Sequence, residues 1–192
     1  MKYLDEHLFP GQLGHFLLVL SLVASLVASI AYYRSTVATV IGEELSWKRL
    51  ARIAFAIDAF SVIVTFFIIY YIISNHYFEY YYAWNHSDKS LGLGYLVSSI
   101  WEGQEGSFLL WGIWHGVLGL VLIRTANKWE APVMTVISVV QVCLATMILG
   151  VYVFDLKIGS NPFLLTREVF QDAPIFAQPD YLQNASMQDG KG

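Results

Sequence analysis

The chain has 192 residues, a net charge of −4 and an unusually apolar composition, with 56% hydrophobic and only 14% charged residues. A soluble domain usually carries about 25% charged residues, so this composition excludes an ordinary soluble domain and favours a membrane protein. The negative net charge gives no indication of a nucleic-acid partner. The single cysteine, Cys143, excludes an intrachain disulfide and a CxxCH haem-attachment motif.

Four apolar stretches are long enough, or nearly long enough, to cross about 30 Å of hydrocarbon. We expect membrane-spanning helices over residues 12–33, 53–74, 107–123 and 133–154. The first stretch is longer than the apolar core of a signal peptide and lacks a clearly basic leader, so we expect it to be retained. The predicted fold class is all-α, a polytopic bundle of about four transmembrane helices within residues 1–155.

Basic residues are concentrated in the segments that join the first helix to the second and the third to the fourth. Six of the eleven Lys and Arg residues lie there: Arg34, Lys48, Arg49, Arg52, Arg124 and Lys128. The positive-inside rule places these segments in the cytoplasm. Both termini and the 75–106 loop are then expected on the periplasmic side of a bacterial inner membrane.

Small residues recur at helix-packing intervals, as Ser21, Ser25 and Ser29 in the first helix and as Gly112, Gly116 and Gly119 in the third. Such spacing lets helix backbones approach closely in lipid, so it predicts a packed bundle.

Asp58 is the one carboxylate inside a predicted span, and such groups usually face the bundle interior or a watery cavity. We favour a shallow ion pair with Arg52 or Arg49 over a functional carboxylate.

Residues 156–192 differ from the rest, being polar, without helical period and interrupted by Pro162, Pro174 and Pro179. We expect an extended segment on the same side as the termini. It ends without an apolar closing element, which suggests that it leads into a larger protein or docks on a partner.

The most unusual local sequence is WEGQEGSFLLW, from Trp101 to Trp111. It is typical of a helix start, because Gly103 and Gly106 permit tight backbone geometry while Glu105 and Ser107 can satisfy free N–H groups. One interpretation is a cap and membrane anchor. The other is an exposed aromatic shelf that suits a flat apolar ligand.

Five histidines raise the question of a metal or haem site. No two of them have the HxxxH or HExxH spacing of a metal site on a helix, so we assign no metal ligand. The sequence also contains no recognisable set of catalytic residues, so we assign no catalytic residue. Imidazole is a normal axial ligand of haem iron, which keeps His115, His76 and His86 as weak candidates. A hydrogen bond to a neighbour is the commoner role of a single histidine in a membrane helix.

The stretch from Trp101 to Trp111 resembles the W-G-x-x-E-G-S-x-L-L-W signature of CcmF-type haem-handling proteins of cytochrome c maturation. A second element, Ser160-Asn161-Pro162-Phe163, resembles the S-N-P-F motif of that family. Glu102 and Gln104 depart from the signature, where the family has glycine and often histidine. The matching positions are Trp101, Gly103, Glu105, Gly106, Ser107, Trp111, Asn161, Pro162 and Phe163.

The resemblance implies the N-terminal part of a many-helix protein that accepts haem from a carrier and joins it to apocytochrome c outside the cytoplasm. The implied cofactor is haem, and the implied partners are the haem carrier, apocytochrome c and other cytochrome c maturation membrane proteins. The family's Trp-rich haem-binding segment lies beyond this chain, so no haem ligand is carried over and this chain alone is not expected to be an enzyme. Two alternatives remain, a scaffold subunit that binds no haem and, resting on Asp58, a small transporter.

Overall fold

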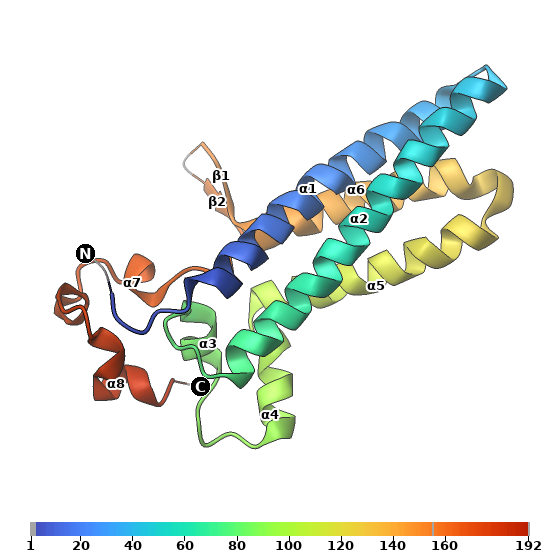
Figure 1. The fold of residues 1–192 in the computed structure, drawn as a ribbon. Helices are drawn as coiled ribbons and strands as arrows, with labels where there is room; N and C mark the ends of the chain where they lie inside the picture. The colour runs from blue at the N-terminus through green and yellow to red at the C-terminus, as the bar shows by residue number, and fades with distance from the viewer. Residues whose placement is uncertain (1–2, 155, 192) are drawn as a thin grey trace.

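The computed structural model describes residues 3–154 and 156–191. Its frame consists of four long helices, α1 (Leu8–Val37), α2 (Ile41–Ser74), α5 (Gln104–Thr125) and α6 (Glu130–Leu149), which form two antiparallel hairpins (Figure 1). Each helix is long and apolar enough to cross a membrane. The predicted all-α fold with four membrane helices is therefore confirmed.

Two helix boundaries differ from the expected ones for identifiable reasons. Helix α2 begins at Ile41, so Lys48, Arg49 and Arg52 lie on a helix rather than in a loop. Helix α6 ends at Leu149 instead of residue 154, because Gly150 takes the left-handed conformation, with φ of 73°, that commonly terminates helices. The chain then forms a two-stranded antiparallel hairpin, β1 (Val151–Val153) and β2 (Leu156–Ile158).

Helix α1 packs against α2 and α6, and α5 packs against the same two helices. The glycines of α5 bring it close to α2, since a Cβ atom at Gly116 or Gly112 would lie only 3.3 Å from Ala59 or Val62. The serines of α1 are buried as predicted, and the hydroxyls of Ser25 and Ser29 donate to backbone carbonyls one turn earlier. The small-residue seams therefore form the helix contacts that their spacing predicted.

Asp58 lies at the centre of this packing and is fully buried. Its carboxylate accepts hydrogen bonds from Ser21 Oγ at 2.6 Å and from Gln141 Nε2 at 3.0 Å. The expected ion pair with Arg52 or Arg49 is wrong, because side chains six and nine residues away do not share a helix face with Asp58. Arg52 instead binds Glu130 with two hydrogen bonds of 2.7 and 2.6 Å.

Short elements cover one end of the bundle. They are α3 (Tyr81–His86), α4 (Leu93–Ser98) and the 3₁₀ turn η1 (Ser99–Trp101) before α5, and α7 (Thr166–Val169), η3 (Pro174–Ala177), η4 (Tyr181–Gln183) and α8 (Ala185–Gln188) after the hairpin. A further 3₁₀ turn, η2 (Asn127–Trp129), joins α5 to α6 at the opposite end.

The tail after the hairpin differs from the extended segment expected for it. It folds back over the segment that follows α2, with bridges between Tyr80 and Leu165 and between Asp88 and Gly190. The tail folds back because it carries apolar side chains to bury: Phe176, Tyr181 and Met187 form a small hydrophobic cluster. These side chains supply the burial that makes a compact tail favourable over an extended one.

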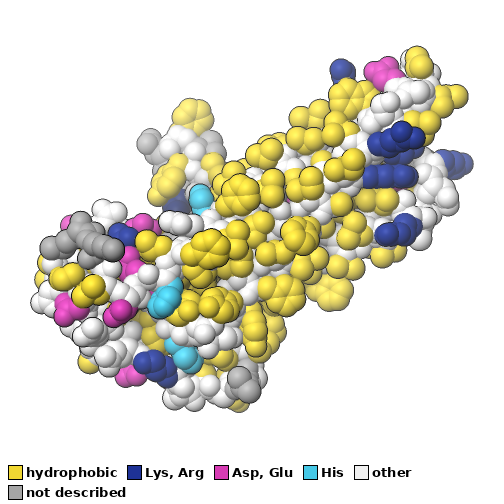
Figure 2. All heavy atoms as spheres, viewed as in Figure 1, with side chains coloured by type: hydrophobic (Ala, Val, Ile, Leu, Met, Phe, Trp, Pro, Cys, Tyr) yellow, Lys and Arg dark blue, Asp and Glu magenta, His cyan; other side chains and the backbone are white. Residues whose placement is uncertain are grey.

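The two ends of the bundle differ in charge (Figure 2). We call one the basic end, defined by Arg34, Lys48, Arg49, Arg52, Arg124 and Lys128. We call the other the loop end, defined by residues 3–7, 75–103, 150–154 and 156–191, where both ends of the described chain lie (Figure 1). An apolar surface separates them, as expected for a protein that crosses a bilayer.

Candidate functional site

The signature turn lies at the loop end, where η1 leads into α5. Helix α5 begins at Gln104, with Gly103 in the extended conformation that precedes a helix. Ser107 does not accept a free N–H as expected; its hydroxyl donates to the carbonyl of Trp101 at 2.8 Å. Glu105 stands in the first turn, where its negative charge favours the positive end of the helix. The turn and the helix start are thus fastened together by the signature itself.

Both glycines of the signature are required by close packing, Gly103 by the ring of Tyr82 in α3 and Gly106 by the backbone carbonyl of Ile100 beside the Tyr82 hydroxyl. A Cβ at Gly103 would lie 2.7 Å from the Tyr82 ring, and one at Gly106 would overlap the carbonyl of Ile100. The Tyr82 hydroxyl donates to that same carbonyl at 2.7 Å. Burial, and secondarily the nearby Glu105, raise the pKa of Tyr82 above its usual range. The sequence did not identify Tyr82, whose role follows only from the fold.

His86, a weak candidate for haem ligation, lies in this contact. Its Nδ1 donates to the carbonyl of Tyr82 at 3.0 Å, and its ring is 4.5 Å from the Tyr82 ring. Its other nitrogen, Nε2, faces Gly103, where an added Cβ would lie 3.0 Å away. In this arrangement His86 packs against the signature turn.

The two tryptophans of the signature are exposed, in contrast to its glycines, whereas Phe108 is partly buried against the core. Trp101 is 38% exposed and Trp111 is 56% exposed, and the ring of Phe108 meets Trp111 edge to face. Trp114, one turn further along α5, is 65% exposed and extends the same surface. We call these four residues the aromatic shelf. Helical spacing from Trp111 would have been sufficient to include Trp114.

The second motif forms a tight turn against the start of α1. The side-chain oxygen of Asn161 accepts the N–H of Phe163 at 2.9 Å, and its amide donates to His15 Nδ1 at 2.8 Å. Pro162 is buried, and the ring of Phe163 fills the space that a side chain at Gly14 would need. Beside this turn lies a cavity of about 350 Å³. Its lining includes His15, Tyr80, Asn161, Phe163 and Arg167.

The remaining candidate histidines occupy different places. His115 lies in α5, with Nδ1 donating to the carbonyl of Trp111 at 2.9 Å, which leaves Nε2 available. His76 has a left-handed backbone, with φ of 53°, and lines a cavity of about 520 Å³ that His7 also lines. Its buried Nδ1 has no hydrogen-bond partner among the described residues.

The fit of these histidines to a haem depends on whether a cavity surrounds their free nitrogen atoms. His115 lines none of the five best-formed cavities of the described residues, and His86 packs directly on Gly103. Within residues 3–154 and 156–191, no three His, Cys, Asp or Glu side chains converge as metal ligands do. The exposed rings of Trp101, Trp111 and Trp114 therefore fit contact with a haem face better than His115 and His86 fit an enclosed haem pocket.

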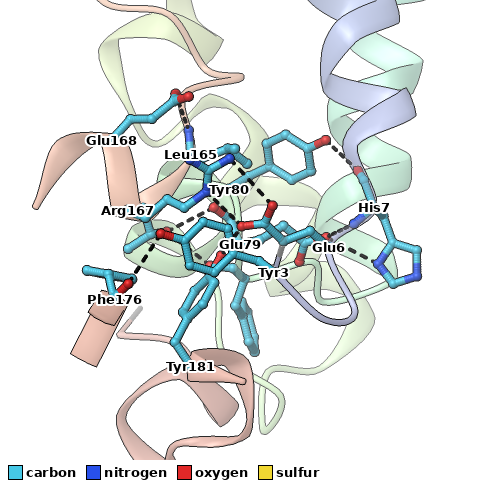
Figure 3. Close-up of polar contacts among 12 residues, drawn as sticks. Tyr3, Glu6, His7, Glu79, Tyr80, Leu165, Arg167, Glu168, Phe176 and Tyr181 are labelled. Atoms are coloured by element: carbon cyan, nitrogen blue, oxygen red, sulfur yellow. Dashed lines mark hydrogen bonds and ion pairs between the residues drawn. The ribbon is translucent and has the colours of Figure 1, made fainter. Parts of the chain in front are cut away.

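A polar cluster fixes the tail to the start of the chain (Figure 3). Glu6 accepts from Arg167 Nε at 2.8 Å and from the Tyr181 hydroxyl at 2.8 Å. Burial, together with the Glu6 carboxylate, raises the pKa of Tyr181 above its usual range. We call Glu6, Arg167 and Tyr181 the tail clamp.

A second set of bonds in the same region holds the segment after α2 against α1 (Figure 3). The backbone N–H of His7 donates to Glu79 at 2.9 Å. The Tyr80 hydroxyl accepts the N–H of Gly11 at 2.9 Å and donates to the carbonyl of His7 at 2.6 Å. Burial raises the pKa of Tyr80 to about 12, so this hydroxyl remains a donor at neutral pH. These contacts hold the segment after α2 against the start of α1.

No protein-family model matches this chain, and no solved structure matches it significantly. The chain is similar to the cytochrome c-type biogenesis protein CcmF of Haemophilus influenzae, with 26% identity over 173 residues. The match covers 86% of this chain and 24% of that relative, so the chain spans about a quarter of the relative's length. The similarity to CcmF, first indicated by two short motifs, thus extends over most of this four-helix membrane protein.

Proposed function

We propose that this chain acts in cytochrome c maturation as the N-terminal part of a CcmF-type membrane protein. The observation that carries the proposal is the similarity to CcmF over 86% of the chain. The fold supports it further, because the turn that opens the signature, before α5, and the second motif, after α6, both lie at the loop end. Two motifs that act on the same molecule must lie at the same end of the bundle.

In this proposal the loop end faces the periplasm and receives haem as cargo. The aromatic shelf offers flat, partly exposed rings, and stacking on such rings suits a planar apolar molecule. Haem would arrive from a carrier and pass to apocytochrome c, in contact with other maturation proteins of the membrane. His115, His76 and His86 remain proposed as minor haem contacts, and the thioether-forming step is assigned to groups outside this chain.

The test is maturation of a c-type cytochrome in bacteria that lack their own CcmF. This chain is co-expressed with the remaining part of a CcmF protein, and covalent haem on the cytochrome is measured by its peroxidase activity in a gel. We expect the double substitution Trp101→Ala and Trp111→Ala to reduce covalent haem at least about ten-fold, since loss of ring stacking costs about 1 kcal/mol or more per ring.

Trp129→Ala is the matched control, because Trp129 is 63% exposed at the basic end, far from the shelf in the fold. It should leave maturation unchanged when the protein level is the same. Full maturation by the double variant would show that the shelf has no role. Failure of the wild-type chain to restore maturation with the remainder would refute the proposed function as a whole.

A scaffold that binds no haem is the second candidate. It is favoured by one observation, that the Nε2 atom of His86 packs on Gly103 and His115 lines none of the five best-formed cavities of the described residues. An absorbance spectrum of the detergent-purified chain, alone and with its co-expressed remainder, distinguishes the two. A haem band that requires Trp101 and Trp111 supports the first function, whereas no haem band in either sample supports the scaffold.

A further inference from the structure

The basic end contains a cavity that plays no part in the proposed function. Its volume is about 430 Å³, and it lies between the first turns of α2 and the last turn of α5. The lining is dominated by cations, with a single carboxylate: Leu45, Lys48, Arg49, Arg52, Ile123, Arg124, Asn127 and Glu130. A concave surface with four cationic side chains is suited to an anion.

The ion pairs in and around the cavity do not neutralise it. The carboxylate of Glu130 forms an ion pair with Arg52, and Lys48 forms an ion pair with Glu44 at 2.8 Å. Arg124 donates to the backbone carbonyl of Leu120 at 3.2 Å. Among the described residues, neither Arg49 nor Arg124 has a carboxylate within ion-pair distance. Two guanidinium groups therefore remain uncompensated at the cavity.

The surface that continues from the cavity is apolar and belongs to the membrane-spanning part of the same helices. Ile53 and Phe60 follow Arg49 at helical spacing along α2 and are 60% and 64% exposed. Val121 and Val117 precede Arg124 along α5 and are 51% and 40% exposed. A molecule with a phosphate in the cavity could thus lay hydrocarbon chains along both helices.

The depth of the cavity also corresponds to a membrane interface. Trp129, which is 63% exposed, stands in η2 beside the cavity residue Asn127. Tryptophan is enriched where hydrocarbon meets the headgroup layer. The cationic side chains therefore lie at the level of lipid phosphates, with the apolar helix surface extending away from them.

We propose that this cavity binds the phosphodiester headgroup of an anionic phospholipid, with Arg49 and Arg124 as its main ligands. A guanidinium group presents two parallel N–H donors that match two phosphate oxygens. Basic pockets between membrane helices bind anionic headgroups by this chemistry. The site is independent of haem handling and requires no particular orientation of the protein.

The test uses the full chain purified in a neutral detergent and native mass spectrometry to count bound lipids during titration. Phosphatidylglycerol is the probe, with phosphatidylcholine and inorganic phosphate as comparisons. We expect tighter binding of phosphatidylglycerol than of phosphatidylcholine. The double substitution Arg49→Gln and Arg124→Gln should weaken it by about 25-fold, from about five-fold for each cation removed.

The matched control, Lys89→Gln with Lys157→Gln, removes the same charge at the loop end and should leave the affinity unchanged. A variant with Arg49→Lys and Arg124→Lys keeps both positive charges but lacks the parallel N–H donors of a guanidinium group. It should lose less affinity than the glutamine variant. Equal binding of the two lipids by the wild type overturns the proposal without any variant. Saturation of the cavity by millimolar inorganic phosphate that blocks phosphatidylglycerol would identify a soluble anion and also overturn it.

Discussion

The two glycines of the signature turn decide how closely Tyr82 can approach the start of α5. Neither glycine has a positive φ, so their role is space rather than backbone freedom. Gly106 is the tighter of the two, since an added Cβ would overlap the backbone carbonyl of Ile100 and lie 2.5 Å from the Tyr82 hydroxyl. A carbonyl inside a 3₁₀ turn cannot move aside as a flexible side chain can. Gly106 is therefore the residue at which the turn tolerates least change.

We predict that Gly106→Ala destabilises the protein by about 1–3 kcal/mol, the usual cost of forcing an extra carbon into a well-packed region. The measurement is the fraction of detergent-purified protein that stays monodisperse after heating. Gly94→Ala is the control, because Gly94 lies in α4 with no atom within 4 Å of its added Cβ. Equal thermal loss in the two variants would show that the close packing of Gly106 on Ile100 and Tyr82 does not stabilise the turn.

The burial of Asp58 could be predicted from the sequence, but its hydrogen-bond partners could not. The sequence identified it correctly as the unusual carboxylate of the bundle, but the ion pair expected for it ignored helix geometry. Ser21 and Gln141, which bind it, lie 37 and 83 residues away on α1 and α6. Helical spacing could have excluded Arg52 and Arg49, whereas naming the true partners requires knowing how three helices pack.

At the scale of elements, hydropathy was sufficient for the four long helices because each one satisfies its own backbone hydrogen bonds. The tail could not be predicted in this way. Its clamp joins residues 161 positions apart, and such contacts leave no periodic trace in the sequence. The same holds for the motif turns, whose partners Tyr82 and Gly14 lie on other elements. Gly11 and Gly14, three residues apart at the start of α1, were the available signal for close ring packing.

The tail clamp provides the prediction at this scale. Glu6→Gln keeps the size of the side chain but removes the charge that Arg167 binds, and the Glu6 side chain is only 5% exposed. Since a hydrogen bond to a charged group contributes about 1.5–3 kcal/mol, the tail should detach at least about ten-fold more often. Limited chymotrypsin digestion, which cuts after Phe170, Phe176 and Tyr181, measures this detachment.

Asp5→Asn is the control for that digestion, because Asp5 is an exposed neighbour that makes no described ion pair. We expect its tail to be cleaved at the wild-type rate. The bundle fragment should remain intact in both variants, since the clamp lies outside the helix contacts. Equal cleavage rates for Glu6→Gln and Asp5→Asn would mean that the apolar cluster around Tyr181 holds the tail without the clamp.

For the molecule as a whole, the separation of charge between the two ends determines how it should insert. The basic end holds six of the eleven Lys and Arg residues, on or beside the helix ends that two short connections join, and insertion responds to such charges near the ends of spans. The loop end holds the two motif turns, both ends of the described chain (Figure 1) and most of the acidic side chains. Hydropathy and charge therefore allow the transmembrane orientation to be predicted, although they say nothing of the contacts within either end.

We predict that the loop end faces outward and the basic end inward, which cysteine labelling can measure directly. Cys143, the single native cysteine, is first replaced by alanine, and single cysteines are then placed at Ser90 or Asn184 and at Ser46 or Asn127, all of them exposed. A membrane-impermeant maleimide applied to cells with a permeable outer membrane should label the first pair only. Lysing the cells should then expose the second pair, which controls for reactivity. Labelling of Ser46→Cys in intact cells would reverse the orientation and remove the periplasmic placement on which the proposed haem transfer depends, while leaving the lipid site untouched.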